Sequence, residues 1–169
     1  MSSIVMLSGP VGAGKSTVAR ELIPLLPEPV AYIEGDKFWS FVAHDKTRKR
    51  HENVRIILRS MTAAAVPFAK SGFTVLLDFS IPVEFLEFAQ RIVKDKTIEF
   101  VIIRPSIEVC EKRAAERAEG KIENYDTFRS FYDLFDQKSH TIQDDNASAS
   151  QIAAKIAEGI KAGTFRLRW

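Results

Sequence analysis

Residues 9–16 of the chain read Gly9-Pro10-Val11-Gly12-Ala13-Gly14-Lys15-Ser16. They satisfy the pattern G-x-x-x-x-G-K-[ST], the apolar run Ile4–Leu7 comes directly before them, and a segment with helical periodicity follows them. A short buried strand, a glycine-rich turn and a helix in this order are the context in which the pattern marks a phosphate-binding loop. The third glycine of a dinucleotide fingerprint would fall at Thr17, which excludes that motif.

Each residue type in the loop has a chemical reason to be there. Glycines let successive backbone N–H groups curl around phosphate oxygens, and the N-terminus of the following helix adds its positive dipole end. We expect Lys15 to reach the β- and γ-phosphates of a nucleotide and Ser16 to ligate Mg²⁺. The alternative is a glycine-rich turn beside a lysine with a buried stem. The candidate phosphate-binding residues are Gly9, Pro10, Val11, Gly12, Ala13, Gly14, Lys15, Ser16 and Thr17.

Composition indicates an ordinary globular protein. The 169 residues are 46% hydrophobic and 27% charged, which argues against disorder, and the length fits a single domain over residues 1–169. The 24 basic and 22 acidic residues give a net charge of +2, which favours neither a nucleic-acid nor a membrane partner. With one cysteine, Cys110, and no visible leader or apolar span, we expect a cytoplasmic protein.

Strand-like and helical patterns alternate along the chain. We expect strands at residues 4–7, 30–33, 73–78, 97–103 and 140–142. We expect helices at residues 15–26, 49–70, 83–93, 106–118, 127–137, with Asp126 as its N-cap, and 148–162. Such alternation gives right-handed crossovers and an α/β fold of three layers, with a parallel sheet between two layers of helices.

The residues after the third predicted strand narrow the class of nucleotide-binding protein. Asp78 is followed three positions later by Ile81, so the D-x-x-G switch of a signalling GTPase is missing, and N-K-x-D does not occur. Remodelling ATPases usually place a glutamate directly after the strand-end aspartate to activate water, whereas this chain has Phe79 there. The remaining interpretation is phosphoryl transfer to a bound hydroxyl group.

With a phosphate loop near its start, an aspartate after the second strand and an arginine-bearing helix after the fourth, the chain resembles the small P-loop kinases related to adenylate kinase. These include gluconate kinase, shikimate kinase, chloramphenicol phosphotransferase and the zeta-toxin group. The resemblance covers nearly the whole chain, although only the phosphate loop is a specific motif. It implies the P-loop NTPase fold with a five-stranded sheet in the order 2-3-1-4-5, ATP and Mg²⁺ as cofactors, and a small helical lid at about residues 106–130.

The resemblance also implies roles for two aspartates. Asp36 stands where several of these kinases keep a carboxylate that orients or deprotonates the acceptor hydroxyl, and the alternative is an N-cap for a helix starting at Lys37. Asp78 ends the third strand near the same cleft, where related kinases hold an acid that binds the acceptor or supports Mg²⁺ through water, and the alternative is a simple strand-end cap. The candidate catalytic residues are Asp36, Lys15 and Arg117.

Three arginines are candidates for the phosphates. Arg113 and Arg117 lie four residues apart, so on a helix they share a face. They resemble the arginine pair that opens the lid of adenylate-kinase-like enzymes, in which one arginine stacks on adenine and the other reaches phosphate. A solvent-exposed helix face is the alternative. Arg129, on the next helix, is a weaker candidate for the same cluster.

The sequence contains no specific motif for the acceptor, in contrast to the phosphate loop for the nucleotide. The candidates to line the acceptor site and give it charge are Phe38, Trp39, Arg55 and Arg59. The alternative is that the aromatic residues pack on the sheet and the helical arginines face solvent. We expect a monomer or weak homodimer that phosphorylates a sugar acid, a shikimate-like acid or an antibiotic-like molecule. The basic run at residues 46–51 keeps a polynucleotide 5′-hydroxyl kinase as an alternative. A non-catalytic ATP-binding regulatory or toxin-like protein is the other alternative.

Overall fold

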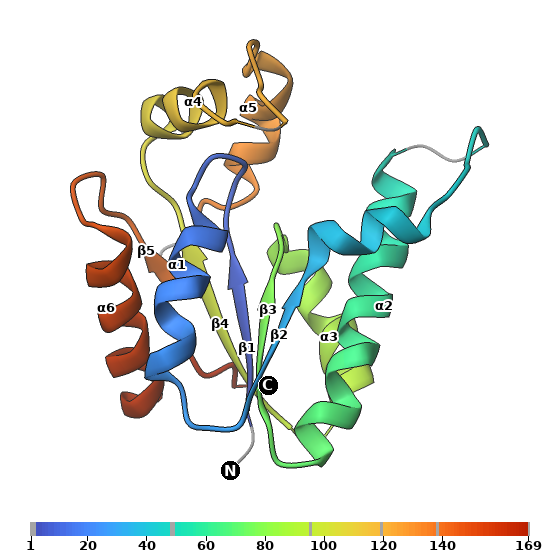
Figure 1. Cartoon of the computed structure of the whole chain (residues 1–169), viewed down its shortest axis with the longest axis vertical. Coiled ribbons are helices and arrows are strands. Elements are labelled where there is room, and N and C mark those ends of the chain that lie inside the picture. The colour runs from blue at the N-terminus through green and yellow to red at the C-terminus, as the bar shows by residue number, and fades with distance from the viewer. Residues whose placement is uncertain (1–2, 48–49, 95, 119, 138, 169) are drawn as a thin grey trace.

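A computed structural model of the chain describes residues 3–47, 50–94, 96–118, 120–137 and 139–168. Five strands form one parallel sheet in the order β2-β3-β1-β4-β5, which confirms the expected order (Figure 1). The strands are β1 (Ser3–Ser8), β2 (Val30–Glu34), β3 (Thr74–Asp78), β4 (Thr97–Ile103) and β5 (Thr141–Ile142).

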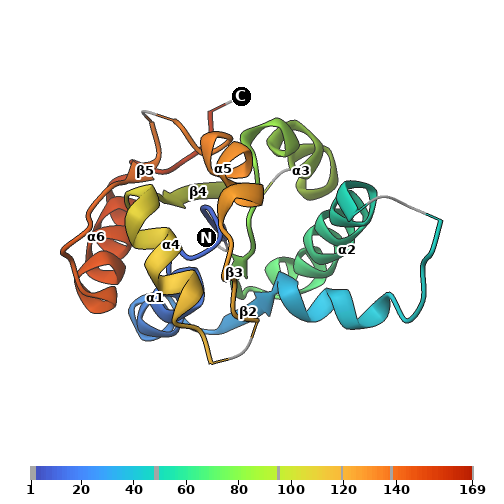
Figure 2. The same ribbon diagram turned by 90° about the horizontal axis from the view of Figure 1, so that it is seen from above.

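Helices cover both faces of the sheet and its upper end. Helices α1 (Lys15–Leu22) and α6 (Ala149–Ala162) pack on one face, and α2 (Arg50–Lys70) and α3 (Leu86–Val93) pack on the other (Figures 1 and 2). Helices α4 (Ile107–Ala115) and α5 (Asp126–Asp133) lie above the carboxyl ends of the strands (Figure 1). Among the described residues, no helix is long and apolar enough to span a bilayer.

The central strand β1 explains why the sheet has helices on both sides. Ile4 and Met6 point into the core beneath α2 and α3, and Val5 and Leu7 point into the core beneath α1 and α6. All four side chains have an exposed fraction of 0%. Because successive side chains of a strand point to opposite faces, a continuous apolar run can be buried only between two layers.

Several element boundaries differ from the prediction. Helix α1 ends at Leu22 and gives way to the 3-10 turn η1 (Ile23–Leu25), because Pro24 has no backbone N–H for a longer α-helix. Helix α3 likewise begins after a 3-10 turn, η3 (Val83–Phe85), and another, η2 (Gly35–Phe41), follows β2. Helix α2 begins at Arg50, and Lys49, the predicted first residue, lies outside the described residues.

The two helices above the sheet are shorter than predicted. Helix α4 ends at Ala115 rather than residue 118. Helix α5 covers Asp126–Asp133, and Tyr125 occupies its N-cap position, so the prediction of Asp126 as the N-cap is wrong. Instead, the Asp126 N–H donates to the side-chain oxygen of Asn124. This turn formed by Asn124 lies just before the helix, which starts one residue earlier than predicted.

The chain returns to the sheet after α6. The N–H of Phe100 donates to the carbonyl of Phe165 (2.8 Å), and the N–H of Leu167 donates to the carbonyl of Ile98 (3.0 Å). Residues 165–167 therefore run antiparallel beside the lower half of β4, where Glu99 and Arg166 form a bridge. Arg166 Nε donates to Glu99 Oε1 at 3.2 Å.

Candidate active site

The phosphate loop connects β1 to α1 and is enclosed by backbone from other elements. A Cβ atom at Gly9 would lie 2.1 Å from the carbonyl oxygen of Ile103, and one at Gly12 would lie 2.2 Å from the carbonyl oxygen of Cys110. Gly12 also has a φ of 83°, a conformation that side chains rarely adopt. These two glycines are therefore required because the loop passes directly against the end of β4 and against α4.

Lys15 lies at the start of α1 and bends back over the loop. Its Nζ donates to the carbonyls of Gly9 (3.1 Å) and Pro10 (3.0 Å), so the ammonium group is half-buried inside the curl of the loop. Burial lowers the pKa of Lys15, whereas the charges of Asp78 and Asp36 act in the opposite direction. The loop thus carries a positive charge at the place where the motif predicts phosphates.

Asp78 ends β3 beside this lysine and is 3% exposed. Tyr32 donates its hydroxyl proton to Asp78 Oδ2 at 3.0 Å. Burial raises the pKa of Asp78, and the charge of Lys15 and hydrogen bonds from Ser16 and Tyr32 oppose that rise. Sequence reasoning did not identify Tyr32, because the contact joins adjacent strands that are more than forty residues apart in the chain.

The oxygen atoms of Ser16 and Asp78 suit a magnesium ion. Mg²⁺ prefers hard oxygen ligands and keeps several waters and substrate phosphate oxygens, so it needs few protein groups. Within the described ranges there is no cluster of three or more histidine, cysteine, aspartate or glutamate side chains that could cage a metal alone. The hydroxyl and the carboxylate beside the phosphate loop therefore fit an ion that arrives with a nucleotide.

A polar cavity of about 490 Å³ lies over the loop and brings most predicted site residues together. Asp36 reaches it from the first turn of η2, and Arg113 reaches it from α4. Arg117 also lines it, but from beyond the end of α4, so the prediction that both arginines share a helix face is wrong. The lining residues are Val11, Gly12, Gly14, Lys15, Ser16, Thr17, Arg20, Glu34, Asp36, Asp78, Phe79, Ser80, Arg113 and Arg117.

A second cavity of about 520 Å³ adjoins the first and is mainly apolar. It includes Trp39 and Arg55 as expected, together with four phenylalanines that the sequence did not single out. Four residues line both cavities: Val11, Asp36, Phe79 and Ser80. The other residues of the second cavity are Trp39, Val54, Arg55, Pro82, Glu84, Phe85, Thr127, Phe128, Phe131 and Leu134.

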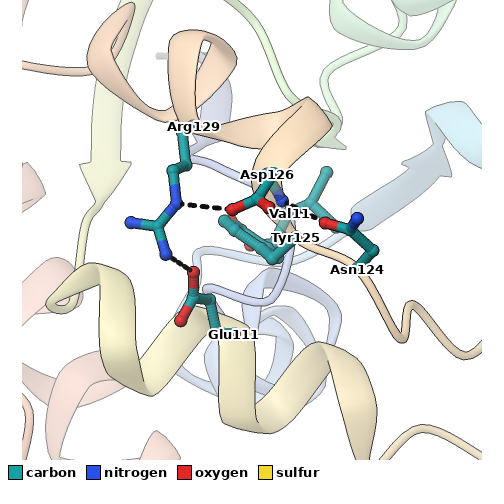
Figure 3. A network of polar contacts seen from close by, with 6 residues as sticks. All are labelled: Val11, Glu111, Asn124, Tyr125, Asp126 and Arg129. Carbon is teal, nitrogen blue, oxygen red and sulfur yellow. Dashed lines mark hydrogen bonds and ion pairs between the residues drawn. The ribbon is translucent and has the colours of Figure 1, made fainter.

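Two of the candidate arginines lie outside both cavities. The Arg59 guanidinium stacks 4.2 Å from the ring centre of Phe88 and lines a separate cavity of about 290 Å³. Arg129 Nε donates to Asp126 Oδ1 at 3.1 Å, and its Nη2 pairs with Glu111 (Figure 3). Arg129 therefore joins α5 to α4 in this structure and does not face the phosphate loop.

The basic run at residues 46–51 is only partly described. Arg48 and Lys49 lie outside the described residues, as do the side chains of Arg50 and His51. Lys46 is exposed between η2 and α2, and it lines neither of the two adjoining cavities.

A phosphate loop after the first strand, a sheet in this order and a polar cavity over the loop together define a member of the P-loop kinase group. The chain belongs to the family of chloramphenicol phosphotransferase-like proteins, whose family model matches residues 2–157. This confirms the resemblance inferred from the sequence, and it supports phosphotransfer at the level of the family.

Solved structures share the fold. A tunicamycin resistance protein from Deinococcus radiodurans is 15% identical and has a TM-score of 0.74, with 100% of both chains covered. The APS kinase CysC of Mycobacterium tuberculosis, solved with AMPPNP and APS, is 21% identical and has a TM-score of 0.72, with 95% of this chain and 98% of that chain covered.

A gluconokinase from Sinorhizobium meliloti 1021 is 16% identical and has a TM-score of 0.67, with 96% of this chain and 93% of that chain covered. At such identities the likeness concerns the fold alone. A comparison with curated proteins found no match.

Proposed function

We propose that the protein transfers the γ-phosphoryl group of ATP, with Mg²⁺, to a hydroxyl group of a small molecule. The observation that carries this proposal is the pair of adjoining cavities, because Asp36 lies on the wall that they share. ATP with its phosphates on the loop would fill the polar cavity, and an acceptor in the apolar cavity would present its hydroxyl beside Asp36. Transfer between two bound molecules requires this kind of juxtaposition.

The residues supply charge and position. Lys15 would exchange its bonds to the loop carbonyls for bonds to phosphate oxygens, and Arg113 and Arg117 would add positive charge from the other side. Ser16, with Asp78 behind it, would hold Mg²⁺, which when bound neutralises phosphate charge. The acceptor oxygen forms a bond to the γ-phosphorus, the bond to the β-phosphate oxygen breaks with its electron pair on ADP, and the hydroxyl proton passes to the Asp36 carboxylate.

The apolar cavity favours an antibiotic-like acceptor over a sugar acid or a shikimate-like acid. Its walls carry the aromatic side chains of Trp39, Phe79, Phe85, Phe128 and Phe131. Among the described residues that line it, Arg55 is the single Lys or Arg, and the acidic residues are Asp36 and Glu84. A small polyhydroxylated acid needs several polar partners, whereas a larger molecule with apolar groups gains free energy by burying them against these rings.

The same lining gives little support to a polynucleotide acceptor. A nucleic-acid strand needs several cationic groups along its path, and the described walls of the acceptor cavity offer one. A purely regulatory ATP-binding protein would have no need for a carboxylate between two cavities. The small-molecule kinase is therefore the better-supported function.

The test is a kinase assay with Mg·ATP and a panel of chloramphenicol, tunicamycin, gluconate, shikimate and a short RNA, in which ADP release and the phosphorylated product are followed. We expect a compound with apolar groups to be phosphorylated, and Asp36→Asn to lower kcat by about 100-fold or more. The affinity of the variant for Mg·AMPPNP should stay within about twofold of the wild type, because Asp36 does not belong to the loop that holds the phosphates.

Glu84→Gln is the matched control, because Glu84 lines the acceptor cavity and not the phosphate cavity. It should change KM for the acceptor and leave kcat near the wild-type value. Undiminished kcat in Asp36→Asn would reject the role of this residue. A wild-type protein that binds AMPPNP yet phosphorylates none of the panel would favour the regulatory alternative.

A further inference from the structure

Helix α5 forms part of the acceptor wall and is also attached to the phosphate loop. Thr127, Phe128 and Phe131 of α5 line the apolar cavity. The preceding residue, Tyr125, donates its hydroxyl proton to the carbonyl oxygen of Val11 at 2.6 Å (Figure 3). One short helix therefore carries both a surface for the acceptor and a direct bond to the loop that would hold ATP.

The bond between Tyr125 and Val11 is short and partly buried. Tyr125 is 6% exposed, and burial raises the pKa of its hydroxyl group, so the phenol keeps its proton and remains a donor at neutral pH. Its acceptor, Val11, lies within the phosphate loop and lines both cavities. A partly buried carbonyl that loses its donor is destabilised, so the position of Val11 depends on the position of Tyr125 at the start of α5.

Helix α4 supports the same stretch of the loop. The backbone of Cys110 packs directly against Gly12, and Arg113 Nη1 donates to the carbonyl of Ala13 at 3.4 Å. Arg129 and Glu111 then connect α5 to α4. Loop residues 11–13 are therefore contacted by two helices that are themselves joined, and Tyr125 makes the contact that comes from the acceptor wall.

A nucleotide bound on the phosphate loop would change the contacts that the loop makes with itself. Lys15 bonds to the carbonyls of Gly9 and Pro10, and a nucleotide on the loop competes for this ammonium group. Val11 is the next residue in the chain, so a rearrangement at Pro10 acts directly on the carbonyl that Tyr125 holds. The bond between Tyr125 and Val11 is thus placed where nucleotide binding would alter it.

We propose that Tyr125 is a positioning residue that couples the acceptor wall on α5 to the phosphate loop. The proposal rests on the proposed function and adds to it that a bound nucleotide orders α5 and that an acceptor held against α5 tightens the binding of the nucleotide. Because coupling between two binding equilibria is reciprocal, a bound nucleotide must also tighten the binding of the acceptor by the same factor. Tyr125 acts through Val11 and does not itself touch the transferred phosphoryl group.

The matched pair of variants is Tyr125→Phe and Tyr132→Phe. Tyr132 also belongs to the α5 region, is likewise 6% exposed, and donates to a backbone carbonyl, that of Pro105, at 2.8 Å. Each variant loses one hydroxyl group that donates to a backbone carbonyl, and Tyr125→Phe also loses the hydrogen bond between this hydroxyl and the Cys110 thiol. Only the bond of Tyr125 ends in the phosphate loop, so a difference between the variants reports the coupling and not a general loss of stability.

Hydrogen exchange of the α5 amides, with and without saturating Mg·AMPPNP, tests the proposal without any acceptor. We expect the nucleotide to slow exchange in residues 126–133 by about fivefold or more in the wild type and in Tyr132→Phe, and to leave it unchanged in Tyr125→Phe. With chloramphenicol as the acceptor probe, the wild type and Tyr132→Phe should bind AMPPNP more tightly by the same factor, and Tyr125→Phe should show no gain.

Nucleotide-dependent protection of α5 that persists in Tyr125→Phe, or is missing in a wild type that binds AMPPNP, would overturn the coupling and leave the proposed function standing. A wild type that does not bind Mg·AMPPNP at all would overturn the proposed function and the coupling with it. If chloramphenicol binds and the AMPPNP affinity does not change, the coupling is likewise overturned.

Discussion

Gly12 fills a place where the phosphate loop and α4 approach so closely that a methyl group does not fit. The carbonyl of Cys110 occupies the position in which a side chain would begin, and that carbonyl belongs to the backbone of a helix, which cannot move aside as a flexible side chain would. The glycine therefore serves packing as well as the curl of the loop. This second role is invisible in the motif, because Cys110 is nearly one hundred residues away in the sequence.

We expect Gly12→Ala to destabilise the protein more than Gly72→Ala does. Both glycines have positive φ, of 83° and 92°, so both variants carry the left-handed strain of about 1–2 kcal/mol. A Cβ at Gly72 meets no atom within 4 Å, whereas one at Gly12 meets backbone. Urea unfolding curves of the two variants measure the difference. Equal losses of stability would show that α4 can move away from residue 12 without a loss of unfolding free energy.

Glu99 gives a pH-dependent prediction. It is 1% exposed on β4, and burial raises its pKa above the ordinary value of 4.5, against the opposing effects of Arg166 and His140. The folded state therefore keeps the proton to a higher pH than the unfolded state does. The free energy of unfolding must then fall as pH rises from about 4.5 through the raised pKa.

Glu99→Gln lacks this titration, and Arg166, which is half-exposed, can be solvated by water instead. We expect the melting temperature of the variant, relative to the wild type, to increase with pH across that window and then to level off. Thermal unfolding at a series of pH values measures this. A relative melting temperature that falls with rising pH would mean that the ion pair with Arg166 outweighs the cost of burial.

At the scale of elements, the arginines of α4 and α5 have different partners although the sequence offers them as one cluster. Arg113 lines the phosphate cavity, whereas Arg129 is held by Asp126 and Glu111. We expect Arg113→Ala to weaken AMPPNP binding by about tenfold, the loss typical of a hydrogen bond to a charged group, and Arg129→Ala to change it by less than about twofold. Calorimetric titration measures both affinities, and similar losses would place Arg129 in the nucleotide site.

The sequence was sufficient to predict the features that depend on residues adjacent in the chain. The phosphate loop, the strand before it and the helix after it depend on adjacent residues, so their positions could be predicted, whereas the order of the sheet was an expectation drawn from the resemblance to the small P-loop kinases. The ends of α4 and α5 could not, because Asn124 and the loop before it compete with the helix for hydrogen bonds. The phenylalanines of the acceptor cavity could not be predicted for another reason, since Phe79, Phe85 and Phe131 come from segments that meet only in the folded chain.

For the whole molecule, nucleotide binding should appear as a gain in thermal stability. A ligand at about 100 times its Kd adds about 2.7 kcal/mol, which for a chain of this size raises the melting temperature by roughly 5–10 °C. We expect Mg·AMPPNP to give such a shift in the wild type and none in Lys15→Ala, because the loop then has no ammonium group for the phosphates. A wild-type protein without a shift would show that the phosphate cavity does not accept a nucleotide.

The position of β1 in the middle of the sheet has a consequence during synthesis. This strand is translated before both of its neighbours in the sheet, which pair with it through residues 75–78 of β3 and 97–102 of β4. Although α1 follows it directly and packs on one of its faces, β1 lacks its neighbouring strands until the chain has been translated as far as residue 102. We expect nascent chains shorter than this to depend on chaperones, and the chain to fold late and in one cooperative step.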